Sequence, residues 1–381
     1  MVAAAELPNA LMPLGNNTSI PSFGIIGGGW YGCHIAITLR SLGFKVRVFE
    51  QHSRLLHEAS GNNQCRLHMG FHYARHSDTR VQSREGFLRF IERYPDLSRE
   101  IPCNIYAVPT RESLIDYDTY RTIMAFSGMH FTEGTPAGVL TLANVDGAIC
   151  TTERVILLSK ARAYFEAELD GLLELGHPVS QVRDIGDNVF VDDKKFDYVV
   201  DATWGHYSSP SIPVIYEPTL LLFYQGPPDF PAVTLVDGPL CSIFPTEMPG
   251  LFTLSSVPYT PLGHFATSAE ARVVRDNVDA RAIAVRRTLM EEQISRYLPD
   301  FQELFHYVGP QLAIKTKATG AHDDRSCHVS QHGRVFSVMS GKIDTIFSAT
   351  ERIMTLMKTK CTNSAASSSI HDVDLKDCLE D

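Results

Sequence analysis

Apolar positions near the start of the chain follow a strand, helix and strand pattern. Phe23 to Ile26 form a short apolar run typical of a buried parallel strand. Four apolar residues then recur at helical spacing (Ile35, Ala36, Leu39 and Leu42), and Gly43 follows where a left-handed C-terminal cap is expected. Residues 45–50, "KVRVFE", alternate like a second strand. The pattern predicts a βαβ start, the usual opening of an α/β domain.

Four more helices and a sheet are predicted further along. Helical spacing returns at 83–93, at 152–173 with Glu153 near the first turn, and at 269–297. Between 215 and 258, short apolar runs separated by Pro and Gly indicate an antiparallel sheet. Residues 333–357 predict a strand, a Ser-Gly-Lys turn and an amphipathic helix.

Composition and charge narrow the class of protein. The chain has 381 residues, 44% of them hydrophobic and 20% charged, which suits two globular domains or one domain with an insertion. A net charge of −10 without a basic run argues against a nucleic-acid partner. No stretch approaches eighteen uninterrupted apolar residues, so we expect no membrane span.

The cysteines and the first residues bear on compartment and metals. Eight cysteines are far apart and none forms a C-x-x-C pair, which argues against a metal site or a disulfide framework. The first twenty residues carry no lysine or arginine and no long apolar run, so they do not resemble a signal peptide. We therefore expect a cytoplasmic protein without a bound metal.

The turn after the first strand carries a dinucleotide-binding pattern. Gly27, Gly29 and Gly32 fit G-x-G-x-x-G, which provides a tight turn, an approach to a pyrophosphate and close packing of helix on strand. Glu50 follows Gly32 by 18 residues, where a carboxylate accepts the hydroxyls of an adenosine ribose. An acid at this point disfavours the 2′-phosphate of NADP. The stretch predicts dinucleotide binding but does not choose between NAD and FAD.

Residues 58–76, "EASGNNQCRLHMGFHYARH", distinguish between NAD and FAD as the predicted cofactor. This polar loop resembles the D-amino acid oxidase-like family of FAD-dependent oxidoreductases, whose members often place A-S-x-x-N and then H-x-G-x-x-Y beneath the flavin. The matching positions are Ala59, Ser60 and Asn63, then His68, Gly70 and Tyr73. Gln64 and Cys65 depart from the small residues that many members have there.

Two later stretches extend the resemblance. Residues 194–208 run from an apolar strand into Ala202, Thr203 and Gly205, similar to the family's V-V-x-A-T-G motif, with Trp204 inserted. Val182 stands where members often contact adenine through the backbone. The Ser-Gly-Lys turn near residue 341 resembles the last cofactor motif, in which a helix N-terminus faces the pyrimidine end of the flavin and stabilises its negative charge. A lysine there adds a positive charge.

The resemblance implies FAD as the resident cofactor. The chain shows neither the G-D-A-x-H motif of aromatic hydroxylases nor a second G-x-G-x-x-G for NAD(P)H. The predicted cofactor-binding residues come from all of these motifs: Gly27, Gly29, Trp30, Tyr31, Gly32, Glu50, Gln51, Ser60, Gly61, Asn62, Asn63, Val182, Ala202, Thr203, Gly341, Lys342 and Ile343.

The predicted fold class is α/β, with a Rossmann-like FAD-binding domain and an inserted antiparallel-sheet substrate domain (α+β). The FAD-binding domain is expected to be discontinuous, built from 22–80, 178–214 and 315–358. Residues 81–177 and 215–314 would form the substrate domain. Residues 1–21 and the serine-rich, acidic 359–381 are expected to be disordered tails.

Catalytic candidates come from the loop after Glu50. An arginine there can hold a substrate carboxylate with two parallel bonds, and a histidine can act as a base. We predict Arg66, His68, Tyr73 and Arg75, with Tyr224 and Tyr259 as weaker candidates from the sheet. Each of these side chains has an alternative role in capping a loop or in a surface ion pair. Covalent attachment of the flavin through His68 or Cys65 is a further alternative.

Three functions follow from the cofactor prediction. The first is oxidation of a CH–NH or CH–OH group of a small molecule by hydride transfer to flavin N5. The second is another flavin reaction, either monooxygenation or a redox-neutral mutase reaction, for which the histidines of His68-x-Gly70-x-His72 are suited. The third is a protein that binds a dinucleotide without turnover. The sequence indicates neither the substrate nor the oligomeric state.

Overall fold

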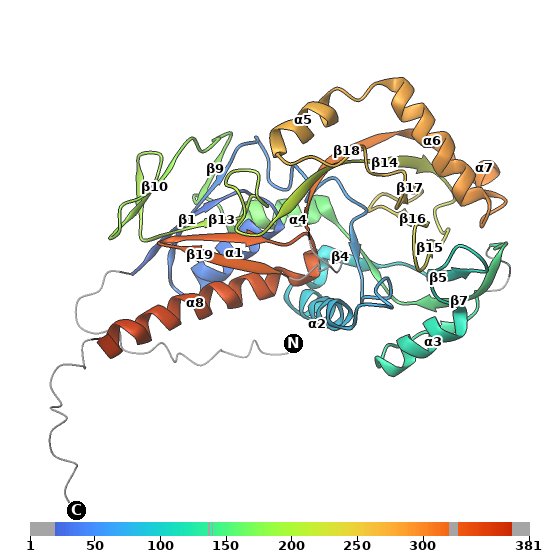
Figure 1. Cartoon of the computed structure of the whole chain (residues 1–381), viewed down its shortest axis with the longest axis horizontal. Coiled ribbons are helices and arrows are strands. Elements are labelled where there is room, and N and C mark those ends of the chain that lie inside the picture. Colours follow the sequence, from blue (N-terminus) through green and yellow to red (C-terminus); the bar gives the residue numbers. More distant parts are fainter. Residues whose placement is uncertain (1–19, 136–137, 139, 320–326, 368–381) are drawn as a thin grey trace, which may run out of the picture.

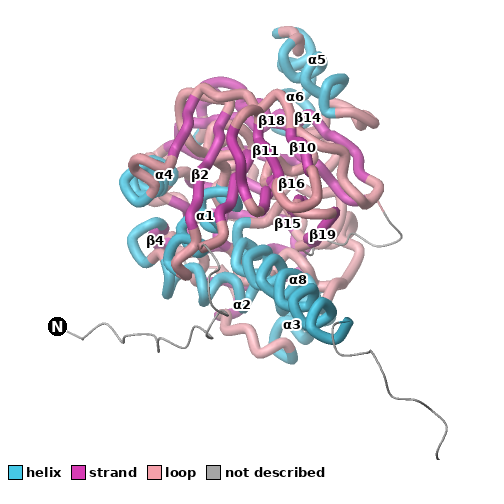
Figure 2. Tube along the Cα trace, turned by 90° about the vertical axis from the view of Figure 1, so that its left-hand side faces the viewer, coloured by secondary structure: helices cyan, strands magenta, loops and turns pink. Residues whose placement is uncertain are grey.

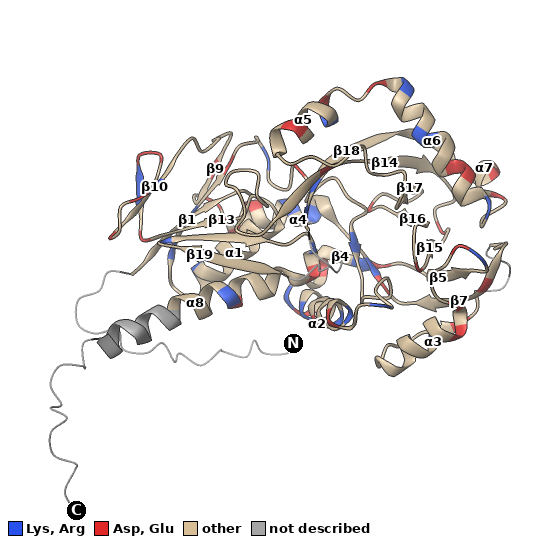
Figure 3. Cartoon of the chain, in the orientation of Figure 1, with Lys and Arg blue, Asp and Glu red and all other residues tan. Residues whose placement is uncertain are grey.

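The computed structural model describes residues 20–135, 138, 140–319 and 327–367. Two large sheets lie side by side, the first at the left of Figure 1 and the second at the right. Lysine and arginine are interspersed with acidic residues over the helices of both parts (Figure 3). The mixed α/β fold confirms the predicted class.

The first sheet is the predicted parallel one. β1 (Ser22–Ile26) lies between β2 (Lys45–Glu50) and β13 (Tyr198–Asp201), parallel to both. β9 (Leu173–Leu175) extends the sheet beyond β2, and β20 (Val335–Met339) extends it beyond β13. β19 (His328–His332) pairs antiparallel to β20 at the edge. Segments far apart in the sequence therefore meet around β1.

Helices cover one face of this sheet and a small β-meander covers the other. α1 (Trp30–Ser41) packs against α8 (Ile346–Ser367), and α2 (Ser77–Arg93) also contacts α8 (Figure 2). Phe23 and Ile25 of β1 point into this helical core. Ile26 points to the opposite core, formed with β10 (Val182–Asp184), β11 (Val189–Val191) and β12 (Lys194–Phe196). This alternation is the period of two expected of a strand buried on both faces.

The second sheet contains the predicted antiparallel strands. Its order is β18 (His306–Ala318), β14 (Val214–Gln225), β17 (Leu251–Ser256), β16 (Cys241–Pro245), β15 (Ala232–Leu235), β5 (Asn104–Pro109), β7 (Val145–Thr151) and β6 (Thr132–Glu133). Only β15 and β5 pair in parallel. Helices α5 (Ser268–Asp276), α6 (Ala280–Ser295), α7 (Phe301–Leu304) and α3 (Tyr117–Phe126) surround it.

A third, small sheet joins the two large ones. It consists of β3 (Arg66–Leu67), β8 (Arg154–Ile156) and β4 (Ser98–Glu100), with β8 in the centre. Two short 3-10 helices complete the described elements, Pro95–Leu97 and Ile343–Thr345, the latter directly before α8. Because β3 follows the loop after Glu50, this sheet holds the polar loop against the second sheet.

Two predicted helices are wrong in extent. The helix predicted at 152–173 is β8 followed by α4 (Leu158–Glu168), because the β-branched run Val155 and Ile156 pairs with β3 and β4. The helix predicted at 269–297 is two helices, α5 and α6. It breaks at Asp279, whose side chain caps α6 by accepting a hydrogen bond from the Ala282 N–H.

The sequence argued against a disulfide framework, and the structure corrects this expectation for one pair of cysteines. Cys103 and Cys150 form a disulfide between the residue preceding β5 and a residue of β7. Within the described residues, no helix has both the length and the apolar character needed to cross a membrane.

The predicted division into domains stays a prediction. Most of α2 and all of α4 and β9 come from 81–177, yet they contribute to the parallel sheet or its helical layer. β18 crosses residue 315 inside the second sheet. α8 continues to Ser367, beyond the predicted end of its helix at 357. The rest of the two predicted tails falls almost entirely outside the described residues.

Candidate active site

The turn after β1 has the geometry that its glycines predict. Gly27 has φ +99°, and its N–H donates to the Phe49 carbonyl at 2.8 Å. A Cβ on Gly32 would lie 1.9 Å from the Gly27 carbonyl oxygen, so only glycine lets α1 begin so close to β1. A Cβ on Gly29 would lie 2.8 Å from the Ser60 hydroxyl. The three glycines leave a backbone cradle facing Ser60.

Glu50 is fixed at the end of β2. One carboxylate oxygen accepts the Gly28 N–H at 2.7 Å and the other accepts the His52 N–H at 2.8 Å. The side chain is buried and lines the smaller of two adjoining cavities. Two backbone donors therefore hold the carboxylate where a ribose can reach its remaining lone pairs.

The two cavities form one elongated space. The smaller, of about 110 Å³, lies beside Glu50, and the larger, of about 490 Å³, lies beneath the polar loop. They share Gly29, Ala59, Ser60, Ala202 and Trp204 as lining residues. The space therefore runs from the end of β2, past the glycine cradle, to β18 and the turn before α8.

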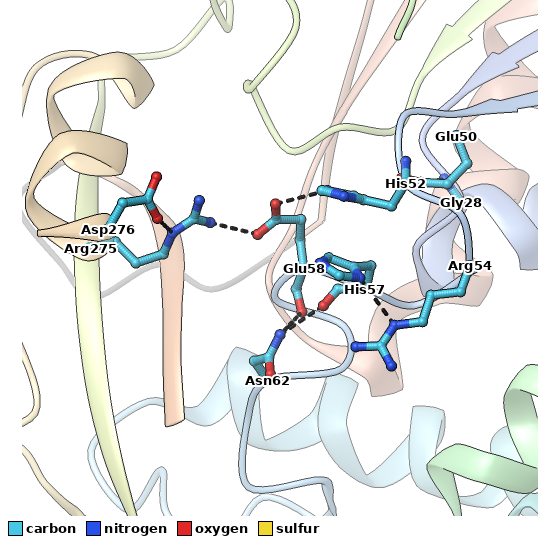
Figure 4. A network of polar contacts seen from close by, with 9 residues as sticks. All are labelled: Gly28, Glu50, His52, Arg54, His57, Glu58, Asn62, Arg275 and Asp276. Carbon is cyan, nitrogen blue, oxygen red and sulfur yellow. Dashed lines mark hydrogen bonds and ion pairs between the residues drawn. The ribbon is translucent and has the colours of Figure 1, made fainter. Parts of the chain in front are cut away.

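A polar network joins the loop after Glu50 to α5 (Figure 4). Glu58 pairs with His52 at 2.9 Å and with Arg275 of α5 at 2.8 Å. Asn62 steadies the loop by donating to the His57 carbonyl at 2.7 Å. Arg275 and its neighbour Arg272 also line the smaller cavity. Since α5 packs on β14, this network connects the second sheet to the dinucleotide end of the cavity.

Arg66 is the buried cation of the larger cavity. Its Nη1 donates to Nε2 of His72 at 2.6 Å, and its Cζ lies 4.2 Å from the centre of the Phe244 ring. Its Nε and Nη2 are buried without a hydrogen-bond partner in the described structure. Burial lowers the pKa of Arg66, whereas Tyr106 and Glu153 raise it. The guanidinium therefore has unused donors beside the cavity.

His68 is a neutral base in the same cavity. Burial lowers its pKa to about 4, so the imidazole carries no charge near pH 7. Its Nδ1 is buried and has no hydrogen-bond partner among the described residues. The His68 ring lies 5.8 Å from the ring of Tyr73, centre to centre. His68 thus presents to the cavity a neutral imidazole nitrogen without a partner in the described structure.

Lys342 and Asp344 also line the larger cavity. Lys342 Nζ donates to Ser83 Oγ at 2.6 Å and lies 4.0 Å from the centre of the Tyr73 ring. It is 3.9 Å from Asp344, whose two buried carboxylate oxygens have no hydrogen-bond partner in the described part of the chain. The predicted lysine is therefore present, but an acid accompanies it.

Comparison with known families identifies the chain. The family of FAD dependent oxidoreductases (DAO) matches residues 23–311. The chain belongs to this family. It is an FAD-dependent oxidoreductase, and the cofactor predicted from the motifs is confirmed.

Two fungal relatives extend the match in sequence. The chain is 65% identical to the FAD-dependent monooxygenase FPY4 of Fusarium mangiferae over 360 residues, covering 92% of this chain and 97% of that protein. It is 28% identical to the FAD-dependent monooxygenase kojA of Aspergillus flavus, covering 88% of this chain and 85% of the relative.

Solved structures show the same fold at low identity. Glycine oxidase from Geobacillus kaustophilus superimposes with a TM-score of 0.67 at 17% identity, covering 87% of this chain and 95% of that one. FAD-bound L-alpha-glycerophosphate oxidase from Mycoplasma pneumoniae gives a TM-score of 0.68 at 13% identity, covering 90% and 95%.

The residues of this flavoenzyme fit FAD. The glycine cradle has no room for a Cβ at Gly29 or Gly32, and Glu50 lies at the β2 end of the elongated cavity. Trp204 has φ +58° and lines both cavities, and a Cβ on Gly341 would lie 2.3 Å from its ring. A ligand with a nucleotide at one end and a polar ring at the other suits this shape.

Most of the predicted cofactor residues line the two cavities. These are Gly27, Gly29, Trp30, Tyr31, Glu50, Gln51, Ser60, Asn62, Asn63, Ala202, Thr203, Gly341, Lys342 and Ile343. Gly32 and Gly61 act instead through backbone packing, and Val182 lies on β10 outside the lining of either cavity. Their roles in binding FAD stay predictions.

The catalytic candidates separate into two groups. Arg66, His68 and Tyr73 line the larger cavity together. Arg75 does not line it, and pairs with Asp237 on a half-exposed surface. Tyr224 lies in the core of the second sheet and Tyr259 packs against it. Cys65 lines the cavity, where burial raises the pKa of its thiol to about 12.

Several lining residues were not predicted. His72 stands inside the quoted motif and Trp204 was visible as an insertion, so both had a sequence signal. Asp344 directly follows the predicted Ile343, so it also had a sequence signal. Others, such as Lys315, Lys317, Arg272 and Arg275, come from elements that only the tertiary fold brings to the cavity.

Proposed function

We propose that this flavoenzyme oxidises a CH–NH or CH–OH group of a small molecule that carries an anionic group. The observation that carries the proposal is a group of buried atoms without partners in the described structure beside one cavity. It includes Nε and Nη2 of Arg66 and Nδ1 of His68, together with the carboxylate oxygens of Asp344 on the same cavity. Buried polar groups without partners are rare in folded proteins, and a ligand that satisfies them explains their retention.

The three side chains have distinct roles in this proposal. Arg66 binds the anionic group through its two unused N–H groups. His68 accepts the proton from the substrate nitrogen or oxygen as the C–H bond breaks. Tyr73 forms the wall between His68 and Lys342. FAD, when bound, would supply the two-electron acceptor for the substrate hydride.

Monooxygenation is the second candidate. It is favoured by the 65% identical relative from Fusarium mangiferae, which is named an FAD-dependent monooxygenase. Oxygen insertion differs from dehydrogenation because the flavin must be reduced before O₂ reacts, and the product gains an oxygen atom. The buried donors of Arg66 and His68 can orient the substrate in either reaction.

Anaerobic reduction separates the two functions. The purified yellow protein is mixed without oxygen with small amino acids, amines and hydroxy acids, and the flavin absorbance is followed. Bleaching by one of these compounds supports dehydrogenation. Reduction by NAD(P)H alone, with ¹⁸O from ¹⁸O₂ in the product, would establish monooxygenation and overturn the proposal.

A further inference from the structure

A fully buried carboxylate lies behind the larger cavity. Glu153, between β7 and β8, has no exposed surface. One oxygen accepts the Met69 N–H at 2.7 Å. The other accepts the Tyr106 hydroxyl at 2.7 Å and the side-chain N–H of Asn104. Three donors, one from the loop at Met69 and two from β5, thus converge on one carboxylate that does not itself line the cavity.

A chain of hydrogen bonds connects Glu153 to Arg66. Tyr106 lies 2.9 Å from Nδ1 of His72, and Nε2 of His72 lies 2.6 Å from Nη1 of Arg66. Tyr106 and Glu153 are buried behind the cavity, whereas His72 and Arg66 line it. The chain therefore runs from the protein core to the cavity wall.

The chemistry of Arg66 sets the direction of this chain. A guanidinium only donates, so Nε2 of His72 must accept. The proton of the neutral imidazole is then on Nδ1, which donates to the Tyr106 oxygen. Tyr106 in turn donates its own proton to Glu153. Burial lowers the pKa of His72 well below its ordinary value, which agrees with a neutral ring.

This chain of hydrogen bonds connects two charged groups, Glu153 and Arg66. Within the described residues, no carboxylate forms a direct ion pair with Arg66, although the guanidinium is buried. The negative charge of Glu153 nevertheless favours the charged form of Arg66. His72 and Tyr106, both neutral, connect the two charges, which leaves Nε and Nη2 of Arg66 unoccupied at the cavity.

We propose that Glu153 is a positioning residue that orients Arg66 through Tyr106 and His72. It accepts the Tyr106 proton, so that Tyr106 can accept the Nδ1–H of His72 while Nε2 accepts from Nη1 of Arg66. This arrangement leaves Nε and Nη2 of Arg66 to face the substrate. The inference rests on the proposed function, in which Arg66 binds the anionic group of the substrate. It adds a residue that touches neither substrate nor cofactor.

Replacing Glu153 by glutamine should reverse the direction of donation in the hydrogen bonds from residue 153 through Tyr106 to His72. The Met69 N–H keeps its acceptor only if the amide oxygen faces it, which turns the new NH₂ group toward Tyr106 and Asn104. Asn104 can accommodate the NH₂ group because its own buried Oδ1 is unpaired in the described structure. Tyr106 then accepts, donates to Nδ1 of His72 and leaves the ring proton on Nε2. Two donors, Nε2–H and Arg66 Nη1, would then face each other.

The first test reads the tautomer of His72 in the holoenzyme. Ring ¹⁵N shifts are measured at pH 8 in histidine-labelled protein and assigned with His72→Gln. Wild-type protein should show the Nδ1–H form, and Glu153→Gln should lose it. Tyr106→Phe should keep the Nδ1–H form, because Arg66 still donates to Nε2, but that proton loses its acceptor. Tyr120→Phe is the matched control, because Tyr120 is equally buried and donates to the Phe71 carbonyl outside the chain. An unchanged His72 tautomer in Glu153→Gln overturns the proposal.

The second test measures anion binding with benzoate as the probe and benzamide as its uncharged counterpart. Benzoate affinity, followed by the visible spectrum of bound FAD, should fall about tenfold in Glu153→Gln, as expected for loss of one charge-assisted hydrogen bond. Tyr106→Phe should match it, and the double variant should be no worse than either single one. Benzamide affinity and FAD content should not change.

The outcomes distinguish the two proposals. A reversed tautomer with weakened benzoate binding supports both. A reversed tautomer with wild-type benzoate affinity, or no benzoate binding by wild-type protein, supports the hydrogen-bond chain but contradicts the role of Arg66 in anion binding. Weakened binding in Tyr120→Phe to the same degree would show a nonspecific loss of packing and overturn the positioning role.

Discussion

Trp204 lies against Gly341 at the junction of the two cavities. A Cβ on Gly341 would lie 2.3 Å from Cζ2 of the Trp204 ring. Trp204 holds φ +58°, directly before Gly205 at φ +77°, so the turn after β13 is built to present this ring to the cavity. The residue inserted into the V-V-x-A-T-G motif and the reduced glycine turn before α8 are therefore complementary to each other.

This contact predicts that Gly341→Ala weakens FAD binding. The added methyl group must displace the indole, and overpacking of this kind costs about 1–3 kcal/mol. We expect roughly five- to 150-fold weaker binding, measured as FAD retained through gel filtration and as the dissociation constant by flavin fluorescence. Gly309→Ala is the matched control, because a Cβ there meets no atom within 4 Å. Equal FAD retention in the two variants would contradict the prediction.

Arg275→Ala should speed the release of FAD. Arg275 joins α5 to Glu58 across the dinucleotide end of the cavity, and its side chain is 18% exposed. A partly exposed pair contributes about 0.5–1 kcal/mol, so the FAD dissociation constant should rise roughly two- to fivefold. Glu58→Gln should give a similar effect, which should shrink in high salt.

A remote ion pair provides the control for this prediction. Arg121 pairs with Glu133 on the surface at 3.1 Å, and neither residue lines a cavity. Arg121→Ala should leave the FAD dissociation rate at its wild-type value. If Arg121→Ala and Arg275→Ala behave alike, the α5 contact has no specific role in holding the cofactor.

His68→Gln should slow flavin reduction by substrate without loss of FAD. A general base contributes roughly 10²- to 10⁴-fold, so at least a hundredfold drop in the reduction rate constant is expected by anaerobic stopped flow. Burial lowers the pKa of His68 to about 4, so the wild-type rate should stay level from pH 8 to about pH 5 and fall only near pH 4. An acid limb near pH 6.5 would contradict the assignment of His68 as the base.

The sequence was informative where function depends on local geometry. Gly27, Gly29, Gly32 and Glu50 lie within one βαβ unit, so spacing alone predicted their arrangement. The environment of Glu153 could not be predicted in this way. Its apolar surroundings suggested a helix, whereas it is buried because Met69, Asn104 and Tyr106 supply three donors from other segments.

Contacts between residues far apart in the sequence explain why the positions of Arg275 and Arg75 were not predicted. Arg275 and Glu58 are 217 residues apart, and no periodicity relates them. Arg75 has the same side chain as Arg66 in the same loop, but it pairs with Asp237 in the turn after β15 and does not line the cavity. Which arginine faces the cavity thus depends on β-strand packing that a motif does not encode.

Glu153 also makes stability depend on pH in a direction that can be measured. Burial raises its pKa from 4.5 to about 7, so between these values the folded protein retains a proton that the unfolded chain has lost. The free energy of unfolding therefore falls as pH rises through this range, by about 3 kcal/mol from this one group. Glu153→Gln has no proton to lose. Chemical denaturation at pH 5 and pH 8 should show the stability of wild type falling relative to the variant by that order, while Tyr120→Phe keeps the wild-type slope. A constant difference between wild type and Glu153→Gln across this range would mean that Glu153 is ionised throughout.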